Sequence, residues 1–106
     1  MVRILIFKAV KIISEKTLKS FWRKYPDAQN PLETWCSLIK HSDWQSPQDV
    51  LNDFPGVRII PNSRVIFNIK ENHYRLVTYV RYTAKKVYIR FIGSHGDYDQ
   101  INAEEI

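Results

Sequence analysis

A histidine, a tyrosine and an aspartate near the end of the chain have the chemistry for proton transfer. His95, Tyr98 and Asp99 stand at positions i, i+3 and i+4, so one turn of helix would bring their side chains together. A histidine suits general acid–base work near neutral pH, and a carboxylate beside it can orient or charge it. A surface histidine beside a C-terminal cap is the other interpretation, and the spacing alone leaves both open.

Basic, aromatic and amide side chains alternate with apolar ones along three segments of the second half. Because side chains alternate faces along a strand, one face of each segment is mostly apolar. The other face carries, in chain order, Arg64, Ile66, Asn68 and Lys70; Arg75, Val77, Tyr79 and Arg81; and Tyr88, Arg90 and Ile92. Such a face can hold phosphates and stack bases. A polar face that simply meets water is the alternative, since antiparallel sheets commonly have one.

Other common chemistries have little support in the sequence. The three histidines and the single Cys36 lack the spacing of metal ligands, and there is neither a phosphate-binding glycine loop nor a nucleophile-elbow serine. Cys36 lies on an apolar helical face, which indicates a core residue. The sequence therefore predicts a site with no metal and no cofactor.

The first half of the chain reads as helices that would cover the sheet. One helix is predicted from an N-cap at Ser14 to Tyr25, and a third, short one from Ser46-Pro47 to Phe54. Between them, Asn30 is the predicted N-cap of a second helix, with Pro31 in its first turn and Glu33 completing a capping box. Apolar residues at i, i+3, i+4 and i+7 mark the buried faces of the two longer helices, namely Leu18, Phe21, Trp22 and Tyr25, then Leu32, Trp35, Cys36 and Ile39.

The second half predicts three strands, over residues 64–70, 74–82 and 86–92, joined by the short turns 71–73 and 83–85. Short connections of this kind imply an antiparallel meander. Residues 3–13 are rich in branched residues and make one N-terminal strand plausible. The predicted fold class is α+β, with that strand and two to three helices packed on one face of a small, mostly antiparallel sheet.

Length and charge narrow the class of protein. The 106 residues fit a single domain, 1–106, with no membrane-spanning run and no leader peptide, and the lone cysteine favours a reducing cytoplasm. The net charge is +5, yet residues 57–95 hold eight bases and one acid, whereas residues 96–106 hold four acids and no base. A concentrated basic region suggests a polyanionic partner, although a solubilising surface would look the same. The acidic tail either folds over the basic face or is solvated.

From about Lys11 to Ala103 the chain resembles the HigB family of bacterial type II toxins, within the RelE-like superfamily of messenger-RNA endonucleases. Residues 1–10 precede the usual family start and are a possible N-terminal extension. The matching segments are, in order, Ile12-Ile13-Ser14, Thr17-Leu18, Phe21-Trp22, Tyr25-Pro26-Asp27-Ala28, Pro31-Leu32, Trp35, Asp43-Trp44, Pro47, Phe54-Pro55, Arg64-Val65, Phe67-Asn68-Ile69-Lys70, Asn72, Tyr74-Arg75-Leu76-Val77, Val87-Tyr88-Ile89-Arg90-Phe91-Ile92-Gly93, His95 and Tyr98-Asp99.

The resemblance implies a RelE-like fold and a toxin that cleaves messenger RNA, typically on a translating 70S ribosome. It also implies a cognate helix-turn-helix antitoxin of the HigA kind, which would neutralise the toxin and through which the pair would oligomerise.

Metal-free RNA cleavage uses the ribose 2′-OH against the adjacent phosphorus, so it needs a proton acceptor, a proton donor and cationic support. We expect Arg75 and Arg90 to neutralise the scissile phosphate, and His95 to transfer the proton. Tyr98 would stack on a base or share the proton relay. The other RNA-binding candidates are Asn68, Lys70, His73 and Asp99.

Two other functions stay open. ParE-type toxins share this fold and poison DNA gyrase, and fold alone does not fix function. A non-catalytic module that binds RNA or the ribosome would keep the basic strands and have no need of His95. Intact transcripts beside broken DNA would mark the gyrase poison, and cut transcripts would mark the nuclease.

Overall fold

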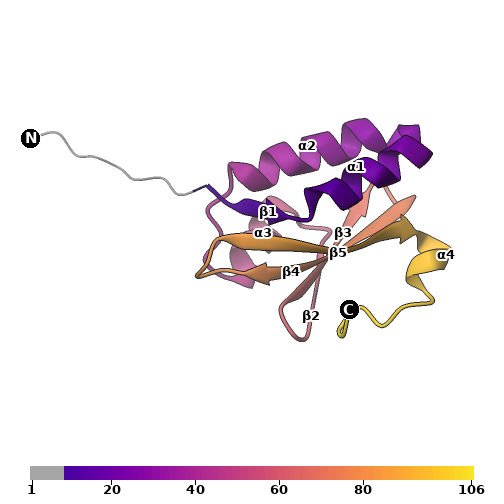
Figure 1. Ribbon diagram of the computed structural model, residues 1–106. Coiled ribbons are helices and arrows are strands. Elements are labelled where there is room, and N and C mark those ends of the chain that lie inside the picture. Colours follow the sequence, from indigo (N-terminus) through magenta and orange to yellow (C-terminus); the bar gives the residue numbers. More distant parts are fainter. Residues whose placement is uncertain (1–8) are drawn as a thin grey trace, which may run out of the picture.

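The computed structural model describes residues 9–106, which form a five-stranded sheet with helices on one face (Figure 1). The strand order is β1-β5-β4-β3-β2. The strands are β1 (Lys11–Ile13), β2 (Arg58–Ile60), β3 (Arg64–Ile69), β4 (Tyr74–Arg81) and β5 (Lys86–Ser94). The helical segments are α1 (Glu15–Lys24), a 3₁₀ turn η1 (Pro26–Ala28), α2 (Gln29–Lys40), α3 (Pro47–Asp53) and α4 (His95–Tyr98). The predicted α+β class is confirmed.

The N-terminal strand forms the edge of the sheet, where β1 pairs in parallel with β5. All other strand pairs are antiparallel, so the sheet is mostly antiparallel as expected. Of the predicted 3–13 segment the structure describes residues 9–13, and among these Lys11–Ile13 form the strand; the rest of that prediction lies outside the described residues. Val10, in the possible extension, is buried in the core.

The helices follow the predicted apolar spacing, but their starts differ. Leu32, Trp35, Cys36 and Ile39 of α2 are buried, as the spacing required. The predicted N-cap at Asn30 is wrong, because η1 leads straight into a helix that already begins at Gln29. The Glu33 carboxylate accepts a hydrogen bond from the Gln29 side chain at 2.6 Å and completes no capping box. Ser14 precedes α1 as predicted, yet it is left-handed (φ 69°) and its side chain caps nothing.

The predicted strands are present with small shifts, and one further strand was missed. β2 is only three residues long and pairs with β3 from Arg58↔Ile66 to Ile60↔Arg64. β3 ends at Ile69, because Lys70 and Glu71 both have positive φ and form the turn into β4. The prediction that Lys70 lies on a strand face beside Asn68 is therefore wrong.

A β-bulge in β5 changes which side chains share a face. Thr78 of β4 pairs with Ile89 and Val77 with Phe91, so Arg90 is the extra, unpaired residue. Beyond the bulge the alternation is reversed: Ile92 packs against the core under the helices, and Phe91 packs on the opposite side. The prediction that Phe91 shares a face with Val87 and Ile89 is wrong for this reason.

Two apolar clusters hold the layers together. The larger lies between the helices and the sheet and includes Leu18, Trp35, Trp44, Phe67 and Leu76. The smaller lies on what we call the distal face, the sheet face turned away from α1 and α2. There Ile66, Val77 and Ala103 are buried, with Phe91, Tyr98, Ile101 and Ile106 packed against them.

The chain after α4 crosses the distal face and covers its centre (Figure 1). We call residues 100–106 the C-terminal strap. The Asn62 side chain donates to the Glu104 carbonyl at 3.1 Å, and the Arg64 guanidinium donates to the Ile106 main-chain oxygen. The acidic tail thus folds over the sheet through apolar and main-chain contacts, while the Glu104 and Glu105 side chains stay exposed.

Candidate functional site

The predicted proton-transfer group lies on α4, a single helical turn with a capped start. The Ser94 hydroxyl accepts from the Asp97 N–H at 3.1 Å, and the Asp97 carboxylate accepts from the Ser94 N–H at 3.4 Å, a reciprocal capping box. This turn brings His95 Nδ1 to 3.2 Å from Asp99 Oδ2, with both side chains more than half exposed. The predicted juxtaposition of His95 and Asp99 is confirmed. Asp99 engages Nδ1, which leaves Nε2 as the nitrogen available to a substrate.

Arg75 lies beside this turn, in a row of residues that crosses three strands of the distal face. Its Cα partners are Asn68 on β3 and Gly93 on β5, two residues before His95. Neighbouring strands are roughly 4.8 Å apart, so the row from Asn68 to Gly93 spans about 10 Å. The row therefore places an amide and a guanidinium in line with the end of β5, two residues before His95.

Gly93 allows the end of β5 to pack closely against Phe91 and Asp97, because a side chain at its position would collide with them. An added Cβ would lie 2.6 Å from Cζ of Phe91 and 3.2 Å from Cβ of Asp97. The glycine thus lets the Phe91 ring and the start of α4 come close to the end of β5. That close approach positions His95 next to the row of Arg75.

The Arg75 guanidinium is half-buried and held by main-chain oxygens. It donates to the Asn72 carbonyl at 3.1 Å and lies 3.5 Å from the Tyr74 carbonyl. Neutral carbonyls fix its direction without cancelling its charge. It remains a cation on the distal face that an anionic ligand can meet.

Arg90 lies elsewhere, although the sequence placed it with Arg75 on one phosphate. Its guanidinium is 5.6 Å from the ring centroids of both Tyr79 and Tyr88. Arg64 lies 4.8 Å from the Tyr79 ring, so two guanidinium groups share one aromatic side chain. Tyr79 is four residues from Arg75, about 13 Å along β4, and the covered pair of Val77 and Phe91 lies between them. The structure does not bring Arg75 and Arg90 together.

Lys70 and His73 lie at the turn between β3 and β4, and Lys70 already has a partner. Its ammonium is 2.6 Å from Asp27 Oδ2, and the Tyr74 hydroxyl donates to Asp27 Oδ1 at 2.6 Å. The bonds from Lys70 and Tyr74 lower the pKa of the Asp27 carboxyl. The bond to Asp27, with burial, raises the pKa of Tyr74 to about 12. His73 is exposed, with Nδ1 2.9 Å from the Lys70 carbonyl.

Tyr98 is half-buried and packs into the apolar cluster under the C-terminal strap. The sequence placed it either on a base or in the proton relay beside His95. In the structure its ring contributes to the contact between α4 and the distal face. The residue therefore supports the turn that carries His95.

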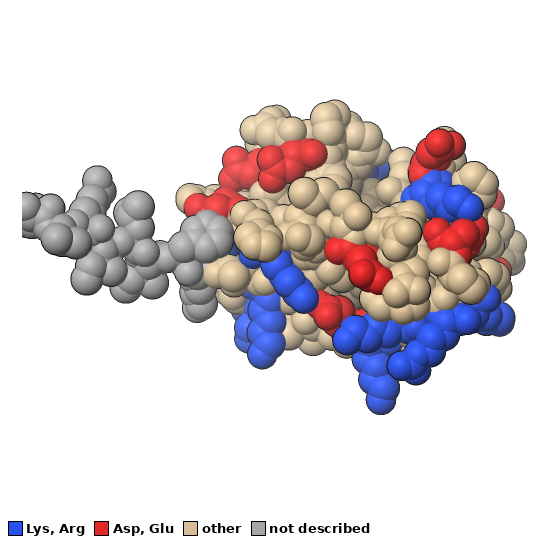
Figure 2. All heavy atoms as spheres, turned by 90° about the horizontal axis from the view of Figure 1, so that it is seen from above, with Lys and Arg blue, Asp and Glu red and all other residues tan. Residues whose placement is uncertain are grey.

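None of the arginines in residues 9–106 lies within ion-pair distance of an aspartate or glutamate side chain. The four ion pairs in this part of the chain use lysine or histidine: Lys40 with Glu15, Lys70 with Asp27, Lys85 with Asp43, and His95 with Asp99. By strand register the distal face carries Arg58, Arg64, Arg75 and Arg81, and the contacts of Arg90 with Tyr79 and Tyr88 place it on the same face. On the helix side, acidic side chains are spread across the middle of the surface and most basic ones follow one border (Figure 2). Arg64 is buried and bonded to main-chain oxygens at the C-terminal strap, and the other arginines of the distal face keep their charge for a polyanion.

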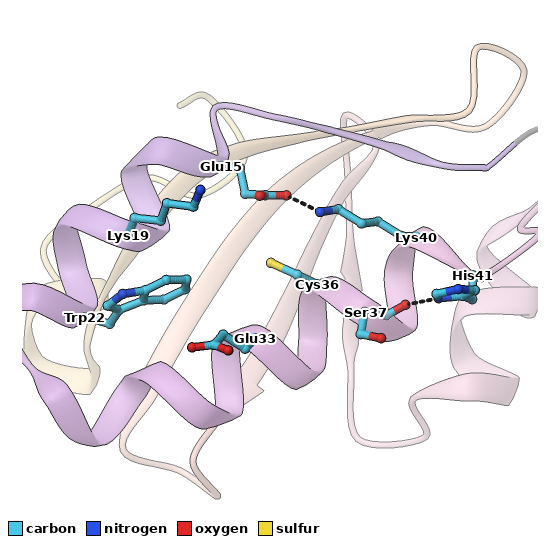
Figure 3. A pocket seen from close by; sticks show the side chains of 8 residues that line it. All are labelled: Glu15, Lys19, Trp22, Glu33, Cys36, Ser37, Lys40 and His41. Atoms are coloured by element: carbon cyan, nitrogen blue, oxygen red, sulfur yellow. Dashed lines mark hydrogen bonds and ion pairs between the residues drawn. The ribbon is translucent and has the colours of Figure 1, made fainter.

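A larger cavity than those of the distal face lies on the other side of the molecule, between α1 and α2 (Figure 3). Its volume is about 510 Å³, and Trp22, Cys36 and the Glu15–Lys40 ion pair line it. Burial raises the pKa of the Cys36 thiol to about 11, which makes a thiolate nucleophile unfavourable. Cys36 is a core residue, as its helical position predicted. The sheet separates this cavity from His95 and Arg75.

A smaller cavity of about 250 Å³ adjoins the row at Asn68, and it was not predicted from the sequence. Phe54, Gly56 and Val57 of the turn after α3 line it, together with Phe67 and Asn68 of β3. Phe54-Pro55-Gly56 could be read in the sequence only as the stop of a helix. The cavity exists because that turn meets the edge of β3, a contact between segments distant in the sequence.

Among residues 9–106 no group of three or more His, Cys, Asp or Glu side chains is placed to hold a metal ion. None of the helices in this part of the chain is long and apolar enough to cross a membrane.

Comparison with known proteins places the chain in a family. It is 25% identical over 92 residues to the mRNA interferase HigB of Escherichia coli O6:H1 strain CFT073, covering 85% of this chain and 89% of that protein. It is 28% identical over 94 residues to the mRNA interferase toxin HigB of Escherichia coli K12, covering 87% and 90%. The mRNA interferase HigB of Shigella flexneri matches to the same extent.

The HigB toxin family model, described as the RelE-like toxic component of a toxin-antitoxin system, matches residues 28–101. The chain is a member of the HigB toxin family and thus the toxic component of a toxin-antitoxin system, with an antitoxin as its partner.

Proposed function

We propose that this toxin is an endoribonuclease that cleaves messenger RNA at the distal face. The observation that carries the proposal is the His95–Asp99 pair beside the row of Asn68, Arg75 and Gly93. A proton-transfer group and an unpaired cation adjoin each other on a face rich in arginine. The relatives named mRNA interferase support the same reaction.

The reaction follows from these groups. The ribose 2′-OH loses its proton to a base and its oxygen bonds to the adjacent phosphorus, while the bond from phosphorus to the 5′-oxygen breaks and that oxygen takes up a proton. The products are a 2′,3′-cyclic phosphate and a 5′-hydroxyl. His95 Nε2 moves the proton, Asp99 orients the ring through Nδ1, and Arg75 faces the charge that grows on the phosphorane. Asn68 fixes the ribose or the backbone.

The other candidate residues take no direct part in the cleavage: they contact the RNA away from the cleaved bond or support α4. Arg90, with Tyr79 and Tyr88, contacts the RNA away from the cleaved bond, where cations and aromatic rings hold single strands. Lys70 and His73 border the same face at the turn before β4, although Lys70 must share its charge with Asp27. Tyr98 supports α4 from beneath.

The site of action and the partner are also part of the proposal. We propose that the messages are cut on the 70S ribosome in the cytoplasm, and that the antitoxin is a HigA-like helix-turn-helix protein. Cuts that keep the reading frame of translated messages would support the ribosome as the place of cleavage. Cuts spread equally over untranslated RNA would contradict it.

The test is induction of the wild-type chain beside His95→Gln and Arg75→Ala, with growth and transcript ends mapped together. We expect new transcript ends with 5′-hydroxyl groups in the wild type, and a loss of at least about 10²-fold in His95→Gln. Both positions are at the surface or half-buried, so melting curves should show that the variants still fold. Growth arrest with intact transcripts and broken DNA would point to gyrase, and undiminished cutting by folded His95→Gln would remove His95 from the mechanism.

A further inference from the structure

We infer that the 250 Å³ cavity at the edge of β3 binds one nucleobase of the RNA and sets a sequence preference near the cut. The inference rests on the proposed function. The cavity ends at Asn68, whose neighbour in the row is Arg75, so a nucleotide with its phosphate at Arg75 has its base within reach of the cavity. No residue of this cavity other than Asn68 has a part in the proposed reaction.

The size and the walls of the cavity suit a single flat ring. Drug-sized ligands occupy cavities of roughly 300–1,000 Å³, so 250 Å³ corresponds to a smaller group. The Phe54 and Phe67 rings meet edge to face at 5.1 Å, and Trp44 packs against Phe54 at 6.0 Å. These rings are held by the core and form a rigid apolar wall. Phe67 and Trp44 are buried and support the partly exposed Phe54 ring, on which a flipped-out base can stack.

The edge of β3 supplies main-chain groups for the same ligand. β2 pairs with β3 only as far as Ile66, so Phe67–Ile69 have no strand neighbour on that side within the described chain. Main-chain N–H and C=O groups at such an edge can hydrogen-bond the edge of a base. Asn68 is exposed, and its amide makes no hydrogen bond within residues 9–106, so it can both donate and accept.

Asp53 decides which bases fit best. Its Oδ2 accepts from the Trp44 indole N–H at 2.8 Å, which fixes the carboxylate, and its Oδ1 has no partner in the described residues. A carboxylate can only accept, so it favours a base that presents an amino group. Adenine, cytosine and guanine each have an exocyclic amine, and uracil has none. We therefore expect adenine, cytosine or guanine in preference to uracil at one fixed position.

The test maps transcript ends after induction of the wild type, Gly56→Leu and Asn68→Asp, with Asn52→Ala as the matched control. Gly56 has no positive φ, and a Cβ built on it meets no atom within 4 Å, so leucine there fills space without a clash in the backbone. Asn52 is an exposed amide on α3 that does not line the cavity. The readout is the ratio of cuts with adenine, cytosine or guanine to cuts with uracil at each position, which does not depend on how much RNA is cut.

We expect a preference in the wild type and in Asn52→Ala that falls about tenfold in Gly56→Leu, within the 1–3 kcal/mol that one base contact supplies. Asn68→Asp should change the preferred base, because it replaces the amide donor by an acceptor. Wild-type cutting without any base preference, or an unchanged preference in Gly56→Leu, would overturn the inference and leave the nuclease intact. Gly56→Leu that keeps the preference but no longer binds the antitoxin would assign the cavity to the partner protein.

Folding must be checked separately. Melting curves of the purified variants show whether Gly56→Leu folds, and Gly56→Ala with Asn68→Asp repeats the test if it does not. A wild-type chain that cuts no RNA would refute the proposed function itself, a different result from nuclease activity without base preference.

Discussion

At the scale of single residues, Asp27 connects two parts of the fold that are far apart in sequence. It accepts bonds from Lys70 and Tyr74, both in or beside the turn between β3 and β4, while Asp27 itself lies in η1 between the helices. The rings of Phe21 and Tyr25 pack around Tyr74 at 5.1 and 6.0 Å. The carboxylate therefore ties the ends of α1 and η1 to the turn that precedes Arg75.

This contact predicts a dependence of stability on pH. The folded-state pKa of Asp27 is lowered from 3.8, so its contribution is present above that value and is lost as the pH falls through the folded pKa. The pKa of Tyr74 is raised from 10.0 to about 12, so its contribution is present below pH 10 and is lost as the pH rises toward 12. Asp27→Asn should lower the melting temperature by a few degrees at pH 7 and by much less below pH 3.8. Melting curves from pH 3 to pH 8 check this, and an equal difference at every pH would contradict it.

At the scale of elements, the turn from β5 into α4 depends on Gly93. We predict that Gly93→Ala destabilises the protein by about 1–3 kcal/mol, the usual cost of overpacking, because the Phe91 ring must move. Gly56→Ala is the control, since its new Cβ meets no atom within 4 Å and should change stability by less than about 0.5 kcal/mol. Urea unfolding of both variants measures the difference. Equal effects of the two substitutions would show that the end of β5 adapts freely.

The elements with long periodic patterns could be predicted from the sequence, and those made by contacts could not. The spacing of the apolar residues predicts α2, because a helix must bury one face; these residues are Leu32, Trp35, Cys36 and Ile39. β2 has only three residues, too few for a period, and exists through its pairing with β3. The bulge at Arg90 has no local marker, and it alone moves Phe91 to the distal face.

The candidate site also has one part that could be predicted from the sequence and one part that depends on contacts between distant segments. His95 and Asp99 are four residues apart, so one helical turn was enough to predict their contact. The neighbourhood of Asn68 and Arg75 follows from predicted strands. The cavity beside Asn68, the C-terminal strap and the distance between Arg75 and Arg90 depend on how segments fold over one another, which spacing along the chain does not contain.

At the scale of the whole molecule, the unpaired arginines of the distal face predict binding that weakens with salt. The net charge is +5, and the ion pairs of the described chain use lysine and histidine rather than arginine. We expect an acidic segment of the antitoxin to bind this face, so the association constant should fall as salt rises from 50 to 500 mM, because the Debye length shrinks below about 10 Å. Titration calorimetry of the two purified proteins checks this. Affinity indifferent to salt would mean that the antitoxin binds elsewhere.

The pairing of β1 with β5 also governs when the protein becomes active during its synthesis. The paired residues Lys11 and Lys86 are 75 positions apart, and β5 is the strand that joins β1 to the rest of the sheet. A growing chain that has emerged only as far as β4 lacks β5, so β1 cannot yet join the sheet. Contacts between residues so far apart in the sequence also form slowly. His95 and Asp99 emerge after β5. A nascent chain halted before that point lacks β5, His95 and Asp99, so we expect a fragment released there to have no nuclease activity.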